Sequence, residues 1–335
     1  MKKVGIFSLV VALLAGMLLT VSCNSCQSGK KAVAVNEVYQ PQSPAFNADS
    51  AYRYVEEQVA FGPRVPGTAA HEACGDYLAT KLAAYGAVVT EQRAEVTHYD
   101  GRRLPIRNII GSYAPEQAKR VLLFAHWDSR PFADEESDPM RRQQPIAGAD
   151  DGASGVGVLL EIARQLQQQP LEMGVDVIFF DLEDWGEPSF ERNHTGSDWW
   201  CVGSRYWAEE PHVENYRAAY GILLDMVGSA GATFLKEGYS MQHAPTMVER
   251  VWSTARKLGY GSFFPVQQGG YITDDHVPVN EMKRAPSINI INLNRETQTG
   301  FGPHWHTLND DMRNIDRNTL KAAGQTVLEV LYTEK

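Results

Sequence analysis

The segment Val175–Asp184 has the sequence VDVIFFDLED, in which an almost unbroken apolar run ends in a cluster of acidic side chains. An apolar run of this length is typical of a strand that is buried on both faces, as in the parallel sheet of an α/β protein. Ligands of open α/β sheets bind beyond the carboxyl ends of the strands. The acids that follow this run are therefore candidates for a functional site.

Three further apolar runs end in the same way. They are Val121–Ala125, which leads into His126 and Asp128; Tyr220–Leu224, which leads into Asp225; and Ser287–Leu293, which leads into a loop with His304, Trp305 and His306. A single acid after one strand is usually a solvated loop residue. Because the carboxyl ends of parallel strands meet at one edge of a sheet, four such clusters favour one shared metal or catalytic site.

The rest of the chain alternates between strand and helix patterns. Two more strands are expected at Val88–Thr97 and Arg107–Tyr113. Helices are expected at Ser50–Phe61, Thr68–Tyr85, Gly152–Gln168, Thr246–Leu258 and Thr319–Tyr332. This order predicts a single globular α/β domain with a mixed, mostly parallel central β-sheet flanked by helices.

The first 22 residues have the layout of a signal peptide. Lys2 and Lys3 precede an uncharged run from Val4 to Val21, and Ser22 then stands before Cys23. A small residue directly before a cysteine resembles a bacterial lipobox. We therefore expect an exported, periplasmic lipoprotein of a bacterium, attached to the membrane only through a lipid on Cys23. The alternative is an uncleaved anchor, because the run is just long enough to span a membrane.

The remaining sequence divides into a tether and a catalytic domain. Residues 23–46 have no sustained hydrophobic period and are expected to form a lipidated N-terminus and tether, and residues 47–335 are expected to form the domain. The net charge is -10, and no stretch concentrates lysine and arginine, so nucleic acid is excluded as a partner. The four cysteines do not suggest a disulfide framework, and Cys74 is expected in the core.

Pairs of adjacent acids suggest a division of labour between metal binding and other roles. Asp150 and Asp151 precede an expected helix, where one can cap the helix while the other binds a metal. Glu183 and Asp184 follow a strand, so their side chains point in different directions, and one can bind metal while the other acts as a general base. Imidazole and carboxylate groups suit zinc. Asp128 can accept the second imidazole N–H of a nearby histidine and orient that ring.

The ordered set of motifs resembles the zinc aminopeptidase superfamily. The motifs are His126-x-Asp128, Gly148-Ala149-Asp150-Asp151, Phe180-Asp181-x-Glu183-Asp184, Leu224-Asp225-Met226 and Trp305-His306-Thr307. Within this superfamily the chain is most similar to glutaminyl cyclases, particularly bacterial ones. Three segments carry that similarity: Asp274-Asp275-His276-Val277-Pro278, Trp305-His306-Thr307-x-Asn309-Asp310 and Gly203-Ser204-Arg205. The similarity extends from about Ser50 to the C-terminus.

The resemblance implies a role for each matching residue. The implied zinc ligands are Asp151, Asp184 and His306, which would hold one zinc ion per chain. Glu183 would be the general acid/base, with Asp225 and Asp274 in its hydrogen-bond network. The implied pocket walls are Trp305 and a tryptophan of the loop between Trp185 and Gly203, for which Trp185, Trp199 and Trp200 are candidates. His126 matches the ligand of a second zinc, which cyclases leave empty.

The resemblance implies a glutaminyl-peptide cyclotransferase, a zinc-dependent acyltransferase acting on peptides and proteins with N-terminal glutamine. The product would be N-terminal pyroglutamate, with release of ammonia. Two alternatives stay open at this point. The ligand residues of a two-zinc aminopeptidase are all present, so ligand identity alone does not exclude hydrolysis. A non-catalytic receptor-like domain would have no need of these intact metal ligands.

Overall fold

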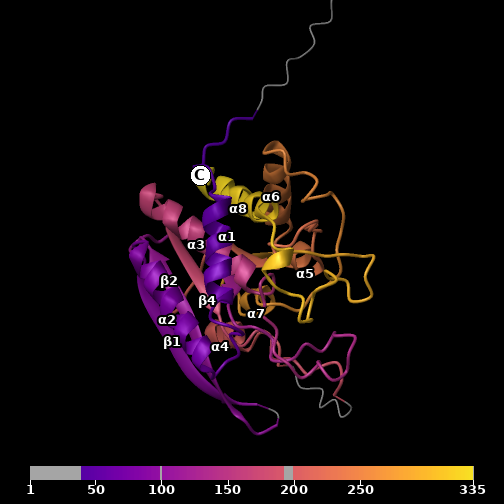
Figure 1. Cartoon of the computed structure of the whole chain (residues 1–335). Coiled ribbons are helices and arrows are strands. Elements are labelled where there is room, and N and C mark those ends of the chain that lie inside the picture. The colour runs from indigo at the N-terminus through magenta and orange to yellow at the C-terminus, as the bar shows by residue number, and fades with distance from the viewer. Residues whose placement is uncertain (1–38, 99, 192–198, 335) are drawn as a thin grey trace, which may run out of the picture. The chain divides into compact units, whose positions relative to one another are not determined.

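The computed structural model describes residues 39–98, 100–191 and 199–334. These residues form a six-stranded sheet in the order β1-β2-β4-β3-β5-β6. Figure 1 labels β1, β2 and β4 of this sheet. The strands are β1 (Val88–Thr97), β2 (Arg103–Tyr113), β3 (Arg120–His126), β4 (Gly174–Phe180), β5 (Gly221–Asp225) and β6 (Ser287–Ile291). Strands β4, β3, β5 and β6 run parallel to one another, whereas β2 is antiparallel to both of its neighbours, β1 and β4. The prediction of an α/β fold with a mixed, mostly parallel sheet is confirmed.

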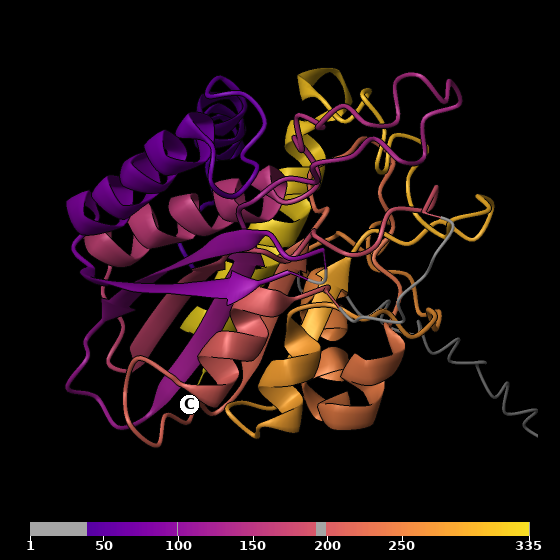
Figure 2. The same cartoon turned by 90° about the horizontal axis from the view of Figure 1, so that it is seen from below.

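Helices cover both faces of the sheet. They are α1 (Ala48–Val59), α2 (Ala69–Ala84), α3 (Ala153–Gln168), α4 (Val202–Glu209), α5 (Gly238–His243), α6 (Pro245–Lys257), α7 (His276–Glu281) and α8 (Arg317–Tyr332). Figure 2 shows the helices α1, α2 and α3 on one side of the strands and the helix α4 on the other. The two faces of the central strands are both buried, which explains why their sequences are continuously apolar.

Alternating side chains of each central strand enter two separate cores. In β3, Leu123 packs in the large core beneath α1, α2, α3, α6 and α8. Leu122 and Phe124 enter the smaller core, where they meet Trp207 of α4 and Val279 of α7. This alternation follows from the two-residue period of a strand.

Side-chain caps define the starts of several helices. Thr68 accepts a hydrogen bond from His71 N at the start of α2, as the sequence predicts, and Asn47 caps α1 in the same way. Gly86, which follows α2, has a φ of 84°, a conformation that glycine adopts without the steric cost of a Cβ. The predicted helices and strands all occur, with ends displaced by only a few residues. The short helices α4, α5 and α7 were not predicted.

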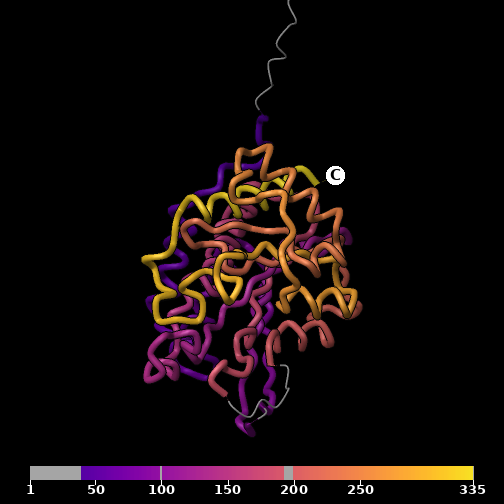
Figure 3. Tube along the Cα trace, turned by 90° about the vertical axis from the view of Figure 1, so that its right-hand side faces the viewer, coloured from indigo at the N-terminus to yellow at the C-terminus, as the bar shows by residue number. Residues whose placement is uncertain are grey.

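The segment before α1 packs on the last helix. Glu329 of α8 accepts hydrogen bonds from the Tyr39 hydroxyl at 2.6 Å and from the backbone N–H of Ser43 at 2.9 Å. Phe46 is buried against Gly324. Figure 3 shows the indigo start of the described chain beside the yellow C-terminal helix. The folded unit therefore begins at Tyr39, eight residues before the boundary expected from the sequence.

The expected signal peptide, the lipid on Cys23 and the first part of the tether lie outside the described residues. Within the described part of the chain, no helix combines the length and apolar character needed to cross a membrane.

Candidate active site

Polar residues at the carboxyl ends of the parallel strands meet at one edge of the sheet, as the sequence predicts. His126 is the last residue of β3 and Asp225 is the last residue of β5. Glu183 and Asp184 follow β4, and His306 lies in the connection between β6 and α8. All of these side chains are buried. The shared site is thus built by strands that are adjacent in the sheet, although their residues are far apart in sequence.

Three of these residues form a group suited to a metal ion. The ligand atoms of Asp151, Asp184 and His306 lie within 4.8 Å of one another. His306 Nε2 is 3.4 Å from Asp184 Oδ1 and 3.7 Å from Asp151 Oδ2. Asp184 Oδ2 is buried and has no hydrogen-bond partner among the described residues. A buried carboxylate oxygen without a partner is costly unless a cation satisfies it, and two carboxylates with an imidazole suit zinc.

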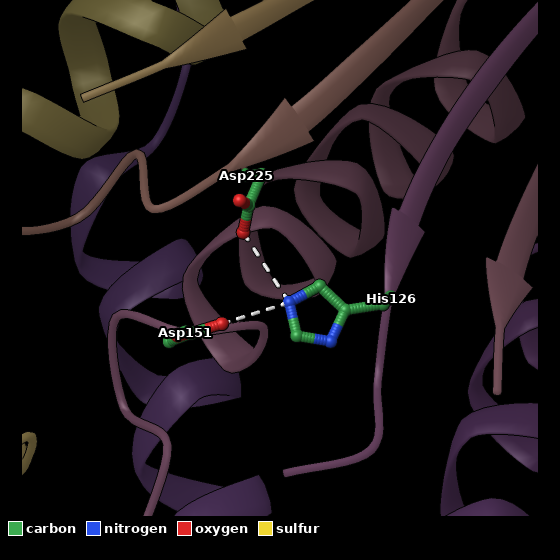
Figure 4. A group of neighbouring side chains, drawn as sticks. All are labelled: His126, Asp151 and Asp225. Carbon is green, nitrogen blue, oxygen red and sulfur yellow. Dashed lines mark hydrogen bonds and ion pairs between the residues drawn. The ribbon is translucent and has the colours of Figure 1, made fainter. Parts of the chain in front are cut away.

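At the second candidate metal position, a histidine lies between two carboxylates. His126 Nε2 lies 3.0 Å from Asp151 Oδ1 and 3.3 Å from Asp225 Oδ1 (Figure 4). Gly152 makes this arrangement possible, because a Cβ at that position would come within 2.7 Å of His126 Nδ1. Burial opposes the charged form of His126, but the carboxylates of Asp128, Asp151 and Asp225 outweigh it and raise its pKa well above the ordinary value.

Asp128 supports both the histidine and the acids after β4. Its Oδ1 lies 3.4 Å from His126 Nδ1, which makes no hydrogen bond among the described residues, so the expected orienting role stays a prediction. The two oxygens of Asp128 also accept hydrogen bonds from the backbone N–H groups of Glu183 and Asp184, each at 3.2 Å. Asp128 therefore fixes the turn that carries the candidate base and one candidate ligand.

The expectation that Asp150 or Asp151 caps the following helix is wrong. Helix α3 has Gly152 at its N-cap position and no side-chain cap. Asp150 instead accepts hydrogen bonds from Gly228 N at 2.8 Å and lies 3.2 Å from His304 Nε2. These tertiary partners satisfy the carboxylate better than a local cap would, so Asp150 joins neighbouring loops rather than starting the helix.

Glu183 has the surroundings of a proton carrier. A carboxylate oxygen of Glu183, the Sγ of Cys201 and a carboxylate oxygen of Asp274 lie within 4.8 Å of one another, and the Cys201 thiol donates to Glu183 Oε1 at 3.4 Å. Burial raises the pKa of Glu183 well above the ordinary value, and the charges of Asp184 and Asp274 add to this effect. A carboxyl group with a raised pKa can take up and return a proton near neutral pH.

Asp274 and Asp225 also have raised pKa values. Burial is the main cause in both, and it raises the pKa of Asp274 to about 7 and that of Asp225 to about 6. Asp274 Oδ2 accepts a hydrogen bond from Asn289 Nδ2 of β6. Asp274 interacts electrostatically with Asp225 and with Glu183, and a hydrogen-bond network that joins the two acids to Glu183 stays a prediction.

A cavity of about 310 Å³ opens above the metal group and the base. Its lining includes Asp151, Glu183, Asp184, Asp225, Asp274, His306, Trp200, Trp305, Tyr271, Ile272, Ile291 and Phe301. Trp305 stacks on His306 with ring centroids 3.6 Å apart, and Trp200 stacks on the same histidine at 6.0 Å. The cavity thus combines a polar floor with aromatic and apolar walls, which is typical of a site that holds a small part of a ligand.

Two tryptophans that the sequence suggested as pocket walls lie elsewhere. Trp185 is buried beside Leu104 and Ile106, because it follows Asp184 and points to the opposite side of the chain. Trp199 packs edge-on against His98, with ring centroids 4.6 Å apart. Of the three candidate tryptophans, Trp200 is the one that lines the cavity.

The sequence did not identify three other residues that contact the site. Cys201, Arg130 and Asp134 were not predicted to contact the site. Arg130 Nη1 donates to Asp184 Oδ1 at 3.1 Å, and Asp134 Oδ1 lies 3.3 Å from His306 Nδ1. The signal available in the sequence was weak, since an arginine and an aspartate in a loop are normally solvated.

Asp181, by contrast, belongs to the fold rather than to the site. It pairs with His71 Nε2 at 2.9 Å and accepts a hydrogen bond from Arg107 N at 2.7 Å. The cluster after β4 therefore contributes two acids to the site and one to the attachment of α2.

The arrangement matches a known family. Residues 108–331 match the model of peptidase family M28. The chain belongs to this family. The zinc dependence expected from the donor atoms agrees with the M28 assignment and with the relatives below. Aminopeptidase YwaD of Bacillus subtilis is 30% identical over 237 residues, which are 68% of this chain and 44% of that relative. Glutaminyl-peptide cyclotransferase of Bos taurus is 27% identical over 68% of this chain and 65% of its own length. The chain thus spans less than two thirds of these curated relatives.

Solved structures of M28-type proteins are similar over their full length. A zinc-dependent exopeptidase from Parabacteroides distasonis is 60% identical, with a TM-score of 0.86, and the match covers 87% of this chain and 100% of that one. Glutaminyl cyclase from Bacteroides thetaiotaomicron is 56% identical, with a TM-score of 0.85, and the match covers 88% of this chain and 100% of that one.

Proposed function

We propose that this M28 protein is a zinc-dependent glutaminyl-peptide cyclotransferase. Its substrates would be peptides and proteins with an N-terminal glutamine, and its products would be N-terminal pyroglutamate and ammonia. The observation that carries the proposal is the buried Glu183, which faces the same aromatic-walled cavity as the metal group. The full-length similarity to a glutaminyl cyclase at 56% identity supports it.

The candidate residues fit the chemistry of cyclisation. The α-amino nitrogen attacks the γ-carboxamide carbon of the same glutamine, so no water nucleophile is needed. Zinc bound by Asp151, Asp184 and His306 would supply Lewis-acid polarisation of the γ-carbonyl. Glu183 accepts a proton from the attacking amine and passes it to the departing amide nitrogen, which leaves as ammonia. Trp305 and Trp200 hold the side chain folded back, in the conformation in which amine and carbonyl carbon meet.

The proposal includes one zinc ion per chain. The group of Asp151, Asp184 and His306 would hold this ion, because it lines the cavity beside Glu183, whereas His126 is not part of the cavity lining. Elemental analysis of the purified protein is expected to give about one zinc per chain. Two zinc ions at full occupancy, with activity that requires both, would favour the aminopeptidase.

A two-zinc aminopeptidase is the second candidate function. The observation that favours it is the complete set of ligand residues, His126 and Asp225 included, at the second metal position. The similarity to aminopeptidase YwaD adds to this alternative. The two functions differ in their products, because hydrolysis releases the first amino acid whereas cyclisation keeps the peptide at full length. Mass spectrometry of a peptide that begins with glutamine distinguishes them.

We also propose that the chain is exported and held at a membrane by a lipid on Cys23. The basic start, the apolar run and the small residue before Cys23 support this location. Cys23→Ser is expected to move the protein from the membrane fraction to the soluble fraction with its activity intact. A variant that stays in the membrane fraction would favour an uncleaved anchor.

A further inference from the structure

A buried ion pair stands beside the metal group and has no role in the mechanism above. Arg130 Nε donates to Asp134 Oδ1 at 2.6 Å, and Arg130 Nη2 donates to Asp134 Oδ2 at 2.8 Å. The side chains are only 1% and 3% exposed. The planar guanidinium therefore meets the carboxylate through two parallel bonds, an arrangement that fixes the direction of both side chains.

Each partner of this pair also contacts a residue of the metal group. Arg130 Nη1 donates to Asp184 Oδ1 at 3.1 Å and lies 3.3 Å from the backbone oxygen of the same residue. Asp134 Oδ1 lies 3.3 Å from His306 Nδ1, so it orients the ring whose Nε2 faces Asp151 and Asp184. Carboxylates that hold the second nitrogen of a ligand histidine set both its tautomer and its direction.

The other contacts of the pair go to the loop after β4. Asp134 Oδ2 accepts a hydrogen bond from Ser189 N at 2.8 Å, and the backbone oxygen of Asp134 accepts one from Ser189 Oγ at 2.9 Å. The Arg130 guanidinium lies over the Trp200 ring, 4.8 Å from its centroid. Trp200 is a wall of the cavity, and Ser189 lies earlier in the same connection between β4 and α4.

We propose that Arg130 and Asp134 are positioning residues that couple metal binding to the placement of Ser189 and Trp200, two described residues of the connection between β4 and α4. The same two side chains hold the candidate ligands Asp184 and His306 on one side and the loop residues Ser189 and Trp200 on the other. Metal binding holds Asp184 and His306 in position, and their contacts stabilise the Arg130–Asp134 pair. The pair in turn stabilises the positions of Ser189 and Trp200. Because coupling between two sites is reciprocal, a disturbed pair weakens metal binding.

If the Arg130–Asp134 pair only stabilises the fold, its substitution should affect zinc binding no more than substitution of any other buried ion pair. The structure offers a matched comparison in Arg120 and Asp176, a second arginine–aspartate pair with two bonds, at 2.7 and 2.6 Å. This control pair joins the starts of β3 and β4, at the opposite end of these strands from the metal group. If Arg130 and Asp134 serve stability alone, substitutions in the two pairs have the same consequences.

The first measurement is zinc affinity, by competition with a chelator. Arg130→Lys keeps the charge but loses the planar fork, and Asp134→Asn keeps the shape but loses the charge. Both are expected to weaken zinc binding by about tenfold to a hundredfold. The control variants Arg120→Lys and Asp176→Asn are expected to bind zinc as the unchanged protein does, even if their thermal stability falls. Equal zinc affinity in all four variants would overturn the proposal.

The second measurement is hydrogen exchange at the Ser189 amide. Addition of zinc to the zinc-free protein is expected to slow this exchange, and in Asp134→Asn the slowing is expected to be lost. Zinc protection of Ser189 that is unchanged in Asp134→Asn would contradict the coupling. Both measurements rest on the zinc of the proposed function but need no turnover. A failure of cyclisation with intact zinc binding is therefore distinguishable from a failure of the coupling.

Discussion

The thiol of Cys201 donates a hydrogen bond to Oε1 of Glu183, with a distance of 3.4 Å between the two heavy atoms. Cys201 stands directly before α4 in a left-handed backbone conformation, with a φ of 58°. Its backbone N–H also donates to the Glu183 backbone oxygen at 2.9 Å. Cys201 therefore holds the candidate base Glu183 through both its backbone and its side chain.

This relationship predicts the effect of replacing the thiol. Cys201→Ala removes the donor and leaves Glu183 less well directed, so the turnover number is expected to fall by about threefold to tenfold, the cost of one modest hydrogen bond. Cys201→Ser supplies a hydroxyl donor and is expected to recover most of the loss. Cys74→Ala is the matched control, because Cys74 is also a buried free cysteine but packs in the large core. An equal loss in Cys201→Ala and Cys74→Ala would show that the thiol acts through stability only.

The role of Glu183 as proton carrier predicts a much larger effect. Glu183→Gln keeps the size and polarity of the side chain but cannot accept the proton, so turnover is expected to fall by about a hundredfold or more. Zinc content should stay the same, because the ligand group is formed by other residues. Steady-state kinetics with elemental analysis checks both points. Near-normal turnover in this variant would remove Glu183 from the mechanism.

Substitutions at two tryptophans of the loop after β4 are expected to have different effects, one on activity and the other on stability. Trp200→Ala opens the cavity wall, so the specificity constant for a glutamine peptide should fall on the order of a hundredfold as the folded-back conformation is lost. Trp185→Ala leaves the cavity wall in place but removes a buried ring, with an expected cost of about 3–5 kcal/mol in the free energy of unfolding. Kinetics and urea unfolding of both variants test this division. The reverse pattern would restore Trp185 as the pocket wall.

The positions of these tryptophans illustrate where the sequence stops being informative. The strand Val175–Phe180 and the acids after it were predictable, because an apolar run and its polar end are local features. The choice among Trp185, Trp199 and Trp200 was not, because it depends on distant contacts. The Trp200 ring occupies the space beside Gly186, where any Cβ would overlap it. A single sequence does not reveal that close approach.

The candidate ligands could be identified from the sequence, whereas the residues that support them could not. Asp151, Asp184 and His306 stand in motifs that the resemblance identified. Arg130 and Asp134 were missed, because their burial results from tertiary contacts and not from a local pattern. The partners of Asp150, Gly228 N and His304, are equally remote in sequence. Because of these contacts, Asp150 does not cap the helix as the sequence had suggested.

A pH dependence is expected for the buried pair of Glu237 and His276. Burial opposes the ionised form of Glu237, but hydrogen bonds from His276 and Ser240 outweigh it and lower its pKa from 4.5 to about 2. Because the pKa of Glu237 is lower in the folded than in the unfolded state, its carboxylate stabilises the fold above pH 4.5. This contribution is lost as the pH falls towards 2. Glu237→Gln is therefore expected to reduce the free energy of unfolding by about 2–3 kcal/mol at pH 7. The difference from the unchanged protein should shrink below pH 4.5.

Urea unfolding at intervals between pH 7 and pH 3 measures this difference. Glu116→Gln is the control, because Glu116 is exposed and should give no difference at any pH. A stability difference for Glu237→Gln that stays constant down to pH 3 would mean that the carboxylate charge contributes nothing.

Cyclisation at a single zinc site is tested by mass spectrometry of two matched peptides. The peptides differ only in their first residue, which is glutamine in one and leucine in the other. The glutamine peptide is expected to lose ammonia and keep its full length, because its side-chain amide is the group attacked by its own amine. The leucine peptide should stay unchanged, because it has no carboxamide. Release of free leucine, with the glutamine peptide left uncyclised, would contradict the account and identify the protein as an aminopeptidase.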